Sequence, residues 1–126
     1  IKFHLLKKSI FAVTKSGTVS LEICNANIPS VVIYKMGFIN YLIVKMLVKT
    51  KYANIINFAA NEEIIPELIQ RNCNAKNIFE QVSGFLENPS KINNQLKKIK
   101  FILNKLKTDK PSTKVASEFI NKLLLD

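Results

Sequence analysis

Lys15-Ser16-Gly17-Thr18-Val19-Ser20-Leu21-Glu22 is the stretch that decides the fold of this chain. It follows a short apolar run at residues 10–13, which is typical of a buried strand, and it leads into a helix-like segment. A strand, a glycine-containing turn and a helix start, in this order, point backbone N–H groups at a phosphate. A carboxylate one turn inside that helix can reach a ribose hydroxyl. The first hypothesis is therefore a nucleotide-sugar site formed by Ser16, Gly17, Thr18 and Glu22.

The same stretch also fits an ordinary helix N-cap. In that alternative the hydroxyl of Ser16 or Thr18 accepts hydrogen bonds from the N–H groups of the first helical turn. A helix start favours a bound anion by only about 0.3–1 kcal/mol, and a bare Ser-Gly-Thr sequence is common. On local chemistry alone the cap is favoured, so ligand binding needs support from the rest of the chain.

The rest of the chain alternates short apolar strands with helices. We expect strands at residues 10–14, 31–34 and 53–56, and helices at residues 18–25, 38–49, 64–70, 75–86, 90–106 and 113–125. This alternation predicts a Rossmann-like α/β fold with a parallel sheet. Residues 108–112 read as a linker. From Ser90 onward the pattern is purely helical, with apolar positions that need a partner surface: Ile92, Leu96, Ile99, Leu103 and Leu106.

The segment from Asn57 to Glu63 is expected to be a loop after the third strand. In a parallel sheet, the loops at the carboxyl ends of the strands form the ligand crevice. Its polar residues are therefore site candidates: Asn57, Asn61, Glu62 and Glu63. Their alternative role is turn and cap chemistry, in which the two glutamates complement a helix N-terminus.

Charge narrows the classes of partner. The 126-residue chain has a formal net charge of +10, and lysine supplies all but one of its 19 basic residues, Arg71 being the exception. Sequence-specific nucleic-acid readers rely on arginine for bidentate contacts, so the composition argues against that class. The favoured explanation of the positive charge is a solvated lysine surface. Attraction to an anionic membrane surface comes second, and a nucleic-acid-binding surface comes third.

The residues that carry most side-chain chemistry are sparse. Cys24 and Cys73 lie far apart and form no C-x-x-C motif, which indicates reduced, cytosolic thiols. His4 is the only histidine and no G-x-S-x-G motif is present, so neither a serine nucleophile nor a metal site is expected. The catalytic residues are unknown and no cofactor is predicted. Ile1, in place of methionine, suggests a piece of a longer protein.

Residues 38–48 are apolar almost all round. The segment is shorter than the roughly 20 apolar residues that span a bilayer. It is either a core helix or an exposed patch that touches membrane or acyl chains, and the two alternatives are equally weighted. In the second alternative the patch is flanked by lysines that an anionic leaflet would attract: Lys35, Lys45, Lys49 and Lys51.

Several ordered stretches resemble the C-terminal part of lipid-A-disaccharide synthase. The first is the stretch at residues 15–22, and Asn57 lies at a further matching position. The others are Pro29-Ser30-Val31-Val32-Ile33-Tyr34-Lys35-Met36, Leu47-Val48-Lys49-Thr50-Lys51-Tyr52 and Glu63-Ile64-Ile65-Pro66-Glu67-Leu68-Ile69-Gln70. No single motif is decisive, but the ordered set is specific. It covers Ser9 to about Asn88, whereas the tail matches only in its helical character.

The resemblance implies a membrane-associated glycosyltransferase of the GT-B type, built from two Rossmann-like halves. The implied donor is UDP-2,3-diacylglucosamine and the acceptor is 2,3-diacylglucosamine 1-phosphate; a β-1,6-linked lipid A disaccharide forms and UDP leaves. The implied location is peripheral, on the cytoplasmic face of the inner membrane. No nucleic-acid partner is implied.

The resemblance also implies roles for parts of this chain. Residues 1–88 would be a UDP-sugar-binding Rossmann-like half-domain, incomplete at its N-terminus, and residues 89–126 a helical tail packed on the missing N-terminal half. Ser16, Gly17 and Thr18 would contact phosphates, Glu22 the ribose, and Asn57 the donor. Phe38, Tyr41 and Leu42 would face acyl chains or the membrane. The acceptor cleft and catalytic base belong to the other half, so this chain is expected to be inactive unless a separate polypeptide supplies that half.

This chain departs from the family pattern at two places. It has Ile56 where the family usually has proline, and Asn61-Glu62 where the family usually has Gly-Arg. An arginine beside a diphosphate strengthens anion binding, so its loss predicts weaker donor affinity. Two alternatives to an enzyme part remain: an inactive fragment of a split gene, and a basic membrane-surface or RNA-binding protein.

Overall fold

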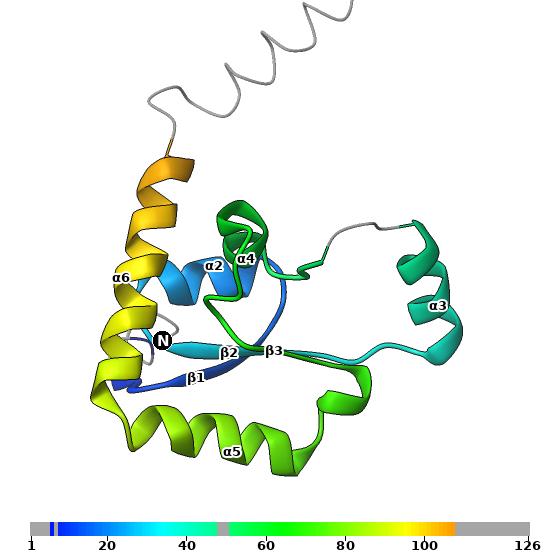
Figure 1. Cartoon of the computed structure of the whole chain (residues 1–126), viewed down its shortest axis with the longest axis horizontal. Coiled ribbons are helices and arrows are strands. Elements are labelled where there is room, and N and C mark those ends of the chain that lie inside the picture. The colour runs from blue at the N-terminus through cyan, green and yellow to red at the C-terminus, as the bar shows by residue number, and fades with distance from the viewer. Residues whose placement is uncertain (1–5, 7, 48–50, 108–126) are drawn as a thin grey trace, which may run out of the picture.

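A computed structural model describes residues 6, 8–47 and 51–107 of the chain (Figure 1). The predicted linker at residues 108–112 and the predicted last helix at residues 113–125 lie outside the described residues. The elements, in chain order, are β1 (Ala12–Lys15), α2 (Thr18–Asn25), β2 (Ser30–Tyr34), α3 (Phe38–Leu47), α4 (Ile55–Ala60), β3 (Glu67–Ile69), η1 (Gln70–Asn72), α5 (Ala75–Leu86) and α6 (Pro89–Leu106).

The strands form one parallel sheet in the order β1-β2-β3. β2 lies in the centre, with Val13 of β1 beside Val31 and Glu67 of β3 beside Val32. Val31 and Val32 are completely buried, as is expected for a strand covered on both faces. The predicted α/β class with a Rossmann-like parallel sheet is confirmed.

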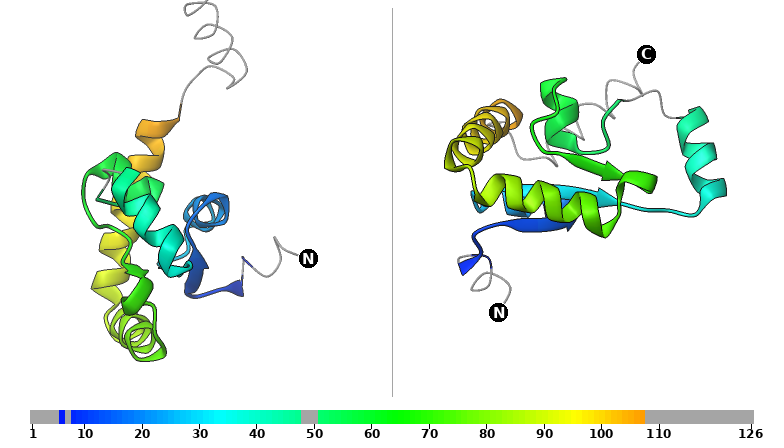
Figure 2. Two further views of the ribbon diagram at one scale, coloured as in Figure 1. Left: turned by 90° about the vertical axis from the view of Figure 1, so that its right-hand side faces the viewer. Right: turned by 60° about the horizontal axis from the view of Figure 1, so that its bottom comes forward.

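Helices cover the two faces of this sheet unequally. In Figure 1, α2 and α4 lie above the sheet and α5 lies below it, and the turned views of Figure 2 show α6 along one end. α6 contacts α2, α4 and α5. On one side a cluster of buried residues forms the core: Cys24, Val32, Ile56, Ile64, Ile65, Ile99 and Ile102. On the other side, Phe85 of α5 packs against Phe11, with ring centroids 5.4 Å apart.

The lysine-rich helix α6 has a clear buried face. Gln95, Ile99 and Ile102 are buried, while Leu106, at the end of the helix, is exposed. Within the described residues this face is covered by α2, α4 and α5. Packing of the tail from residue 89 onward on a further half of the protein stays a prediction.

The secondary structure predicted for two segments between β2 and α5 is wrong. Residues 53–56 were expected to form a strand, but Asn54 caps α4, its Oδ1 accepting a hydrogen bond from the N–H of Ile56 at 2.8 Å. Residues 64–70 were expected to form a helix. The strand β3 lies there instead, because Pro66 disfavours the helical conformation in the residue before it and because the following residues pair with β2.

Candidate functional site

A pocket opens at the carboxyl ends of β1 and β2. Its volume is about 290 Å³ and its lining residues are Ser16, Gly17, Tyr34, Met36 and Ala53. Ser16 and Gly17 follow β1, Tyr34 is the last residue of β2, Met36 lies beyond that strand, and Ala53 precedes α4. This is the edge at which parallel α/β sheets bind ligands.

Gly17 forms the turn between β1 and α2. Its backbone dihedrals, φ 128° and ψ −159°, lie in a region that is essentially restricted to glycine. A Cβ atom added to Gly17 would meet no other atom within 4 Å. The turn therefore needs glycine for its backbone conformation, and the space beside it is open.

The N-terminus of α2 is not capped by a side chain. Gly17 occupies the N-cap position and makes no side-chain cap hydrogen bond. The Ser16 hydroxyl instead donates to the carbonyl of Ala53 at 2.7 Å, and the Ser20 hydroxyl donates to the carbonyl of Gly17 at 2.7 Å. The ordinary cap that local chemistry favoured is therefore not the arrangement found. In the first turn of α2 the N–H of Ser20 donates to the carbonyl of Gly17 at 3.1 Å, and Gly17, at the start of the helix, lines the pocket.

Two further polar side chains lie on the exposed face of α2. Thr18 and Glu22 are four residues apart on one helix, which places them on the same face, and both are exposed. The Lys15 ammonium lies 5.4 Å from the ring centre of Tyr34, a residue of the pocket wall. Neither Thr18 nor Glu22 lines the pocket. The pocket itself combines the glycine turn at the start of α2 with an aromatic ring that has a cation beside it. This combination suits an anionic ligand with a planar or sugar group attached.

Asn57 lies in α4 and is completely buried, not in a loop as expected. Its Oδ1 accepts hydrogen bonds from the N–H groups of Ile64 and Ile65, both at 2.9 Å. Its Nδ2 donates to the carbonyl of Ile65 at 2.7 Å and to Glu67 Oε1 at 2.8 Å. These bonds use both amide hydrogens and both lone-pair positions of the oxygen. Asn57 therefore holds the turn that leads into β3, and its expected direct contact with a donor stays a prediction.

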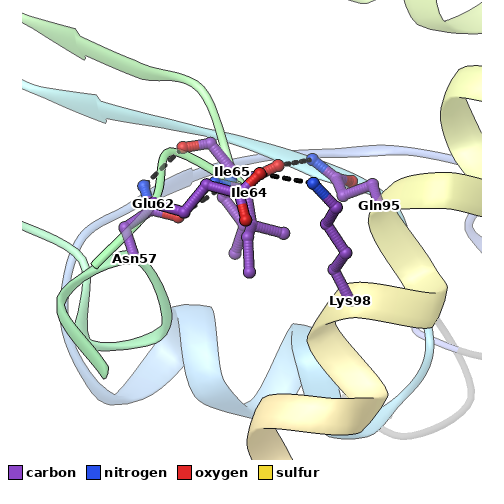
Figure 3. Close-up of polar contacts among 6 residues, drawn as sticks. All are labelled: Asn57, Glu62, Ile64, Ile65, Gln95 and Lys98. Atoms are coloured by element: carbon purple, nitrogen blue, oxygen red, sulfur yellow. Dashed lines mark hydrogen bonds and ion pairs between the residues drawn. The ribbon is translucent and has the colours of Figure 1, made fainter. Parts of the chain in front are cut away.

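Glu62 faces helix α6, as Figure 3 shows. Its carboxylate forms an ion pair with the ammonium of Lys98. One turn earlier on α6, Gln95 accepts from the N–H of Ser30 at 2.9 Å and donates to the carbonyls of Ser30 and Ile64. Ser30 is the first residue of β2, so these contacts join α6 to the amino end of the strand. Glu62 is thus placed with α6, apart from the five residues that line the pocket.

The remaining loop candidates have local roles. Asn61 ends α4 in the left-handed conformation, with φ 51°. Glu63 is exposed, and its Oε1 accepts a hydrogen bond from the N–H of Glu67 at 3.3 Å. Both arrangements match the turn and cap chemistry that was the alternative for this loop.

The apolar helix α3 stands away from the rest of the chain in Figures 1 and 2. Phe38, Ile39 and Met46 are 74%, 73% and 76% exposed, and Leu42 is about half exposed. Tyr41 is half-buried. For these side chains the structure favours an exposed patch over a core helix. None of the helices in the described part of the chain is both long and apolar enough to cross a membrane.

Cys24 offers no reactive centre. Cys24 is buried, and burial raises the pKa of its thiol to about 11. Such a thiol stays protonated at neutral pH, which makes it a poor nucleophile and a poor metal ligand. No group of three or more His, Cys, Asp or Glu side chains in the described ranges is arranged to hold a metal ion. His4 lies outside the described residues.

The sequence patterns did not indicate most of the pocket wall. Tyr34, Met36 and Ala53 line it, yet none of them was a site candidate. Tyr34 and Ala53 were expected in strands, and Met36 ended one of the stretches that carry the resemblance. Two further residues, Glu67 and Gln70, do not line the pocket but accept hydrogen bonds from the backbone N–H groups of Ala53 and Met36, which do. Both lie in the segment for which a helix was expected. Only the pairing of β3 with β2 reveals their position.

Comparisons with known proteins agree on one family. The family model described as "Lipid-A-disaccharide synthetase" matches residues 2–120. A protein named lipid-A-disaccharide synthase from Rickettsia prowazekii (strain Madrid E) is 46% identical over 98 residues, which are 78% of this chain and 26% of that protein. The protein of the same name from Rickettsia typhi is 39% identical over 119 residues, 93% of this chain and 31% of that protein. This chain thus spans between about a quarter and a third of the length of these relatives.

Proposed function

Because this chain belongs to the lipid-A-disaccharide synthase family, we propose that it is the donor-binding part of such an enzyme. The donor would be UDP-2,3-diacylglucosamine and the acceptor 2,3-diacylglucosamine 1-phosphate, giving lipid A disaccharide 1-phosphate and UDP. The acceptor cleft and the catalytic base would come from the part of the relatives that this chain does not span. The chain by itself would bind the donor without turning it over.

The proposed reaction is an inverting displacement at the anomeric carbon of the donor. The bond from that carbon to the diphosphate breaks as the acceptor hydroxyl oxygen attacks. The hydroxyl proton would go to the catalytic base outside this chain, and negative charge develops on the departing UDP. The contribution of this chain would be electrostatic, since preorganised N–H donors stabilise charge where it develops. No metal or cofactor is needed for that contribution.

The phosphate contacts are assigned to Ser16, Gly17 and Thr18. The Ser16 hydroxyl already donates to Ala53, so its backbone N–H is the group proposed to reach the phosphate, together with those of Gly17 and Thr18. Glu22, four residues after Thr18, is proposed to accept hydrogen bonds from the ribose hydroxyls. Gly17 is proposed to let the diphosphate approach the backbone closely, because no side chain intervenes.

A peripheral position at the cytoplasmic face of the inner membrane is proposed from the exposed side chains of α3. Phe38, Leu42 and Met46 would enter the interface or contact acyl chains, with Tyr41 at its edge. Lys35 and Lys51 flank the helix and are exposed. Each lysine near an anionic leaflet adds about 1 kcal/mol at most, so apolar contact and charge would act together.

The observation that carries the proposal is the uncapped N-terminus of α2 beside the pocket at Gly17. Its test is calorimetry of the purified 126-residue chain with UDP. Binding that Gly17→Trp abolishes is the expected result. Gly84→Ala is the matched control: Gly84 lies in α5, where a Cβ would make an ordinary contact at 3.8 Å. Absence of UDP binding at millimolar ligand contradicts the proposal, and salt-sensitive RNA binding in its place favours the basic RNA-binding alternative.

A further inference from the structure

We propose that Glu67 and Gln70 are positioning residues that fix the wall of the nucleotide-sugar pocket, an inference that rests on the proposed function. Neither residue lines the pocket. Glu67 begins β3 and Gln70 follows its last residue. Each forms side-chain hydrogen bonds to the backbone of the segments that do line it.

Glu67 holds the segment that precedes α4. Its Oε2 accepts a hydrogen bond from the N–H of Ala53 at 2.8 Å, and its Oε1 accepts from the N–H of Asn54 at 2.9 Å. Asn57 Nδ2 is a third donor to the same carboxylate. Bonds to a carboxylate are stronger than bonds between neutral groups. Ala53 is therefore held at its N–H by Glu67 and at its carbonyl by Ser16.

The same network reaches the turn at Gly17. The buried Asn54 side chain donates to the Ser20 hydroxyl at 3.2 Å, and that hydroxyl donates to the Gly17 carbonyl at 2.7 Å. Glu67 is thus joined through Asn54 and Ser20 to the residue at the start of α2. A shift of the Glu67 carboxylate would be transmitted both to Ala53 and to Gly17, which line the pocket.

Gln70 holds the segment that follows β2. Its Oε1 accepts from the N–H of Met36 at 2.8 Å, and its Nε2 donates to the carbonyl of Met36 at 3.1 Å. Both backbone groups of this one lining residue are satisfied by a single side chain. Met36 is beyond the end of β2, where no strand pairing would otherwise fix its position.

The backbone of Gln70 supports a positioning role. Its φ is 52°, in the left-handed region that residues other than glycine, asparagine and aspartate seldom adopt. Such a conformation persists only where the surroundings determine it strongly, and it is concentrated at ligand sites. Here it turns the chain directly after β3 and brings the Gln70 side chain to Met36.

The chain offers a matched control for Gln70 at the opposite end of β2. Gln95 bonds the N–H and the carbonyl of Ser30, as Gln70 bonds those of Met36. Gln95 is buried and also donates to Ile64. Loss of its amide should therefore destabilise the fold at least as much as loss of the Gln70 amide. Gln95 does not reach the pocket, so only stability should suffer.

The test compares UDP affinity, measured by calorimetry and corrected for the folded fraction, in Gln70→Leu, Glu67→Gln and Gln95→Leu. Each of the first two should weaken UDP binding about tenfold, because backbone groups at the pocket wall lose their partner. Gln95→Leu should lower the unfolding midpoint and leave the affinity unchanged. If Gln95→Leu does not fold, Asn74→Ala, which removes the N-cap of α5, serves as the destabilised control.

The outcomes separate the two proposals. If the unsubstituted chain binds UDP, and Gln70→Leu binds it as tightly as Gln95→Leu and the unsubstituted chain do, the positioning role is overturned. The proposed function is then left intact. Absence of UDP binding by the unsubstituted chain would overturn both. Faster amide exchange of Met36 in Gln70→Leu, but not in the control, accompanies the affinity loss if Gln70 acts by fixing Met36.

Discussion

The Ser16 hydroxyl donates a hydrogen bond to the carbonyl of Ala53, 37 residues further along the chain, at 2.7 Å. This bond joins the turn after β1 to the turn before α4, and both residues line the same pocket. It also explains why Ser16 does not cap α2, since its hydroxyl hydrogen is directed across the pocket. The two turns therefore form one wall.

Ser16→Ala is expected to lower the free energy of unfolding by about 1 kcal/mol, the usual net value of one hydrogen bond. It should also weaken UDP binding several-fold, because the two turns lose their link. Urea unfolding and calorimetry measure the two effects. Ser90→Ala is the control, because that exposed serine bonds only its neighbour Asn88 in the contacts described. An unchanged UDP affinity in Ser16→Ala would show that the link does not shape the site.

Glu22→Ala is expected to weaken UDP binding more than it weakens the binding of inorganic diphosphate, because only UDP carries ribose hydroxyls. Competition calorimetry with both ligands measures the difference. Glu80→Ala removes an exposed carboxylate from α5 and controls for the change in net charge. An equal loss for both ligands contradicts contact with the ribose.

Phe38→Asp combined with Leu42→Asp is expected to reduce binding to liposomes that contain anionic lipid. The unfolding midpoint should change little, because both side chains are exposed on α3. Phe79→Asp is the matched control, since Phe79 is 71% exposed but lies on α5. Sedimentation with liposomes gives the readout. Unfolding of the double variant would place the α3 side chains in a core instead.

Asn57→Ala is expected to lower the free energy of unfolding by about 3 kcal/mol, because buried N–H and carbonyl groups of the turn before β3 lose their partners. Asn93→Ala changes an exposed position of α6 and should be nearly neutral. Urea unfolding compares the two. A loss of UDP affinity without loss of stability in Asn57→Ala would instead favour direct contact with the donor.

Cys24 gives a prediction for pH. Its pKa is raised from 9.0 to about 11 by burial, so the folded state disfavours the thiolate. The resulting stability is fully present below pH 9 and is lost as the pH rises from 9 toward 11. At pH 8, iodoacetamide should therefore modify the half-buried Cys73 first. Mass spectrometry of the native chain checks the order, and early modification of Cys24 would contradict its burial.

The sequence indicated the elements whose local signals agree with their tertiary environment. The change from an apolar run to helical spacing at Gly17 identified α2, and the Asn88-Pro89 break identified the start of α6. The prediction from sequence failed at residues 53–56, where β-branched residues suggested a strand but the Asn54 cap begins α4. It failed again at β3, which is only three residues long and exists because it pairs with β2.

The residues of the candidate site also divide into those that local sequence signals predict and those that depend on tertiary contacts. Ser16 and Gly17 could be predicted because the glycine turn is a local signal. Met36, Ala53, Glu67 and Gln70 could not, because their roles depend on which segments the sheet brings together. Asn57 was identified as important, but its hydrogen bonds are to Ile64, Ile65 and Glu67 of its own chain. Periodicity gives no information on such long-range polar contacts.

The most direct test of donor binding is an NMR titration of the 126-residue chain with UDP, following backbone amide shifts. UDP is expected to shift the amides of Ser16, Gly17, Thr18 and Ala53, while the amide of Phe85, on the opposite side of the sheet, stays unchanged. The same titration with Gly17→Trp should give no shifts at these positions. Absence of shifts at millimolar UDP, or shifts confined to residues away from the Gly17 turn, would contradict the account.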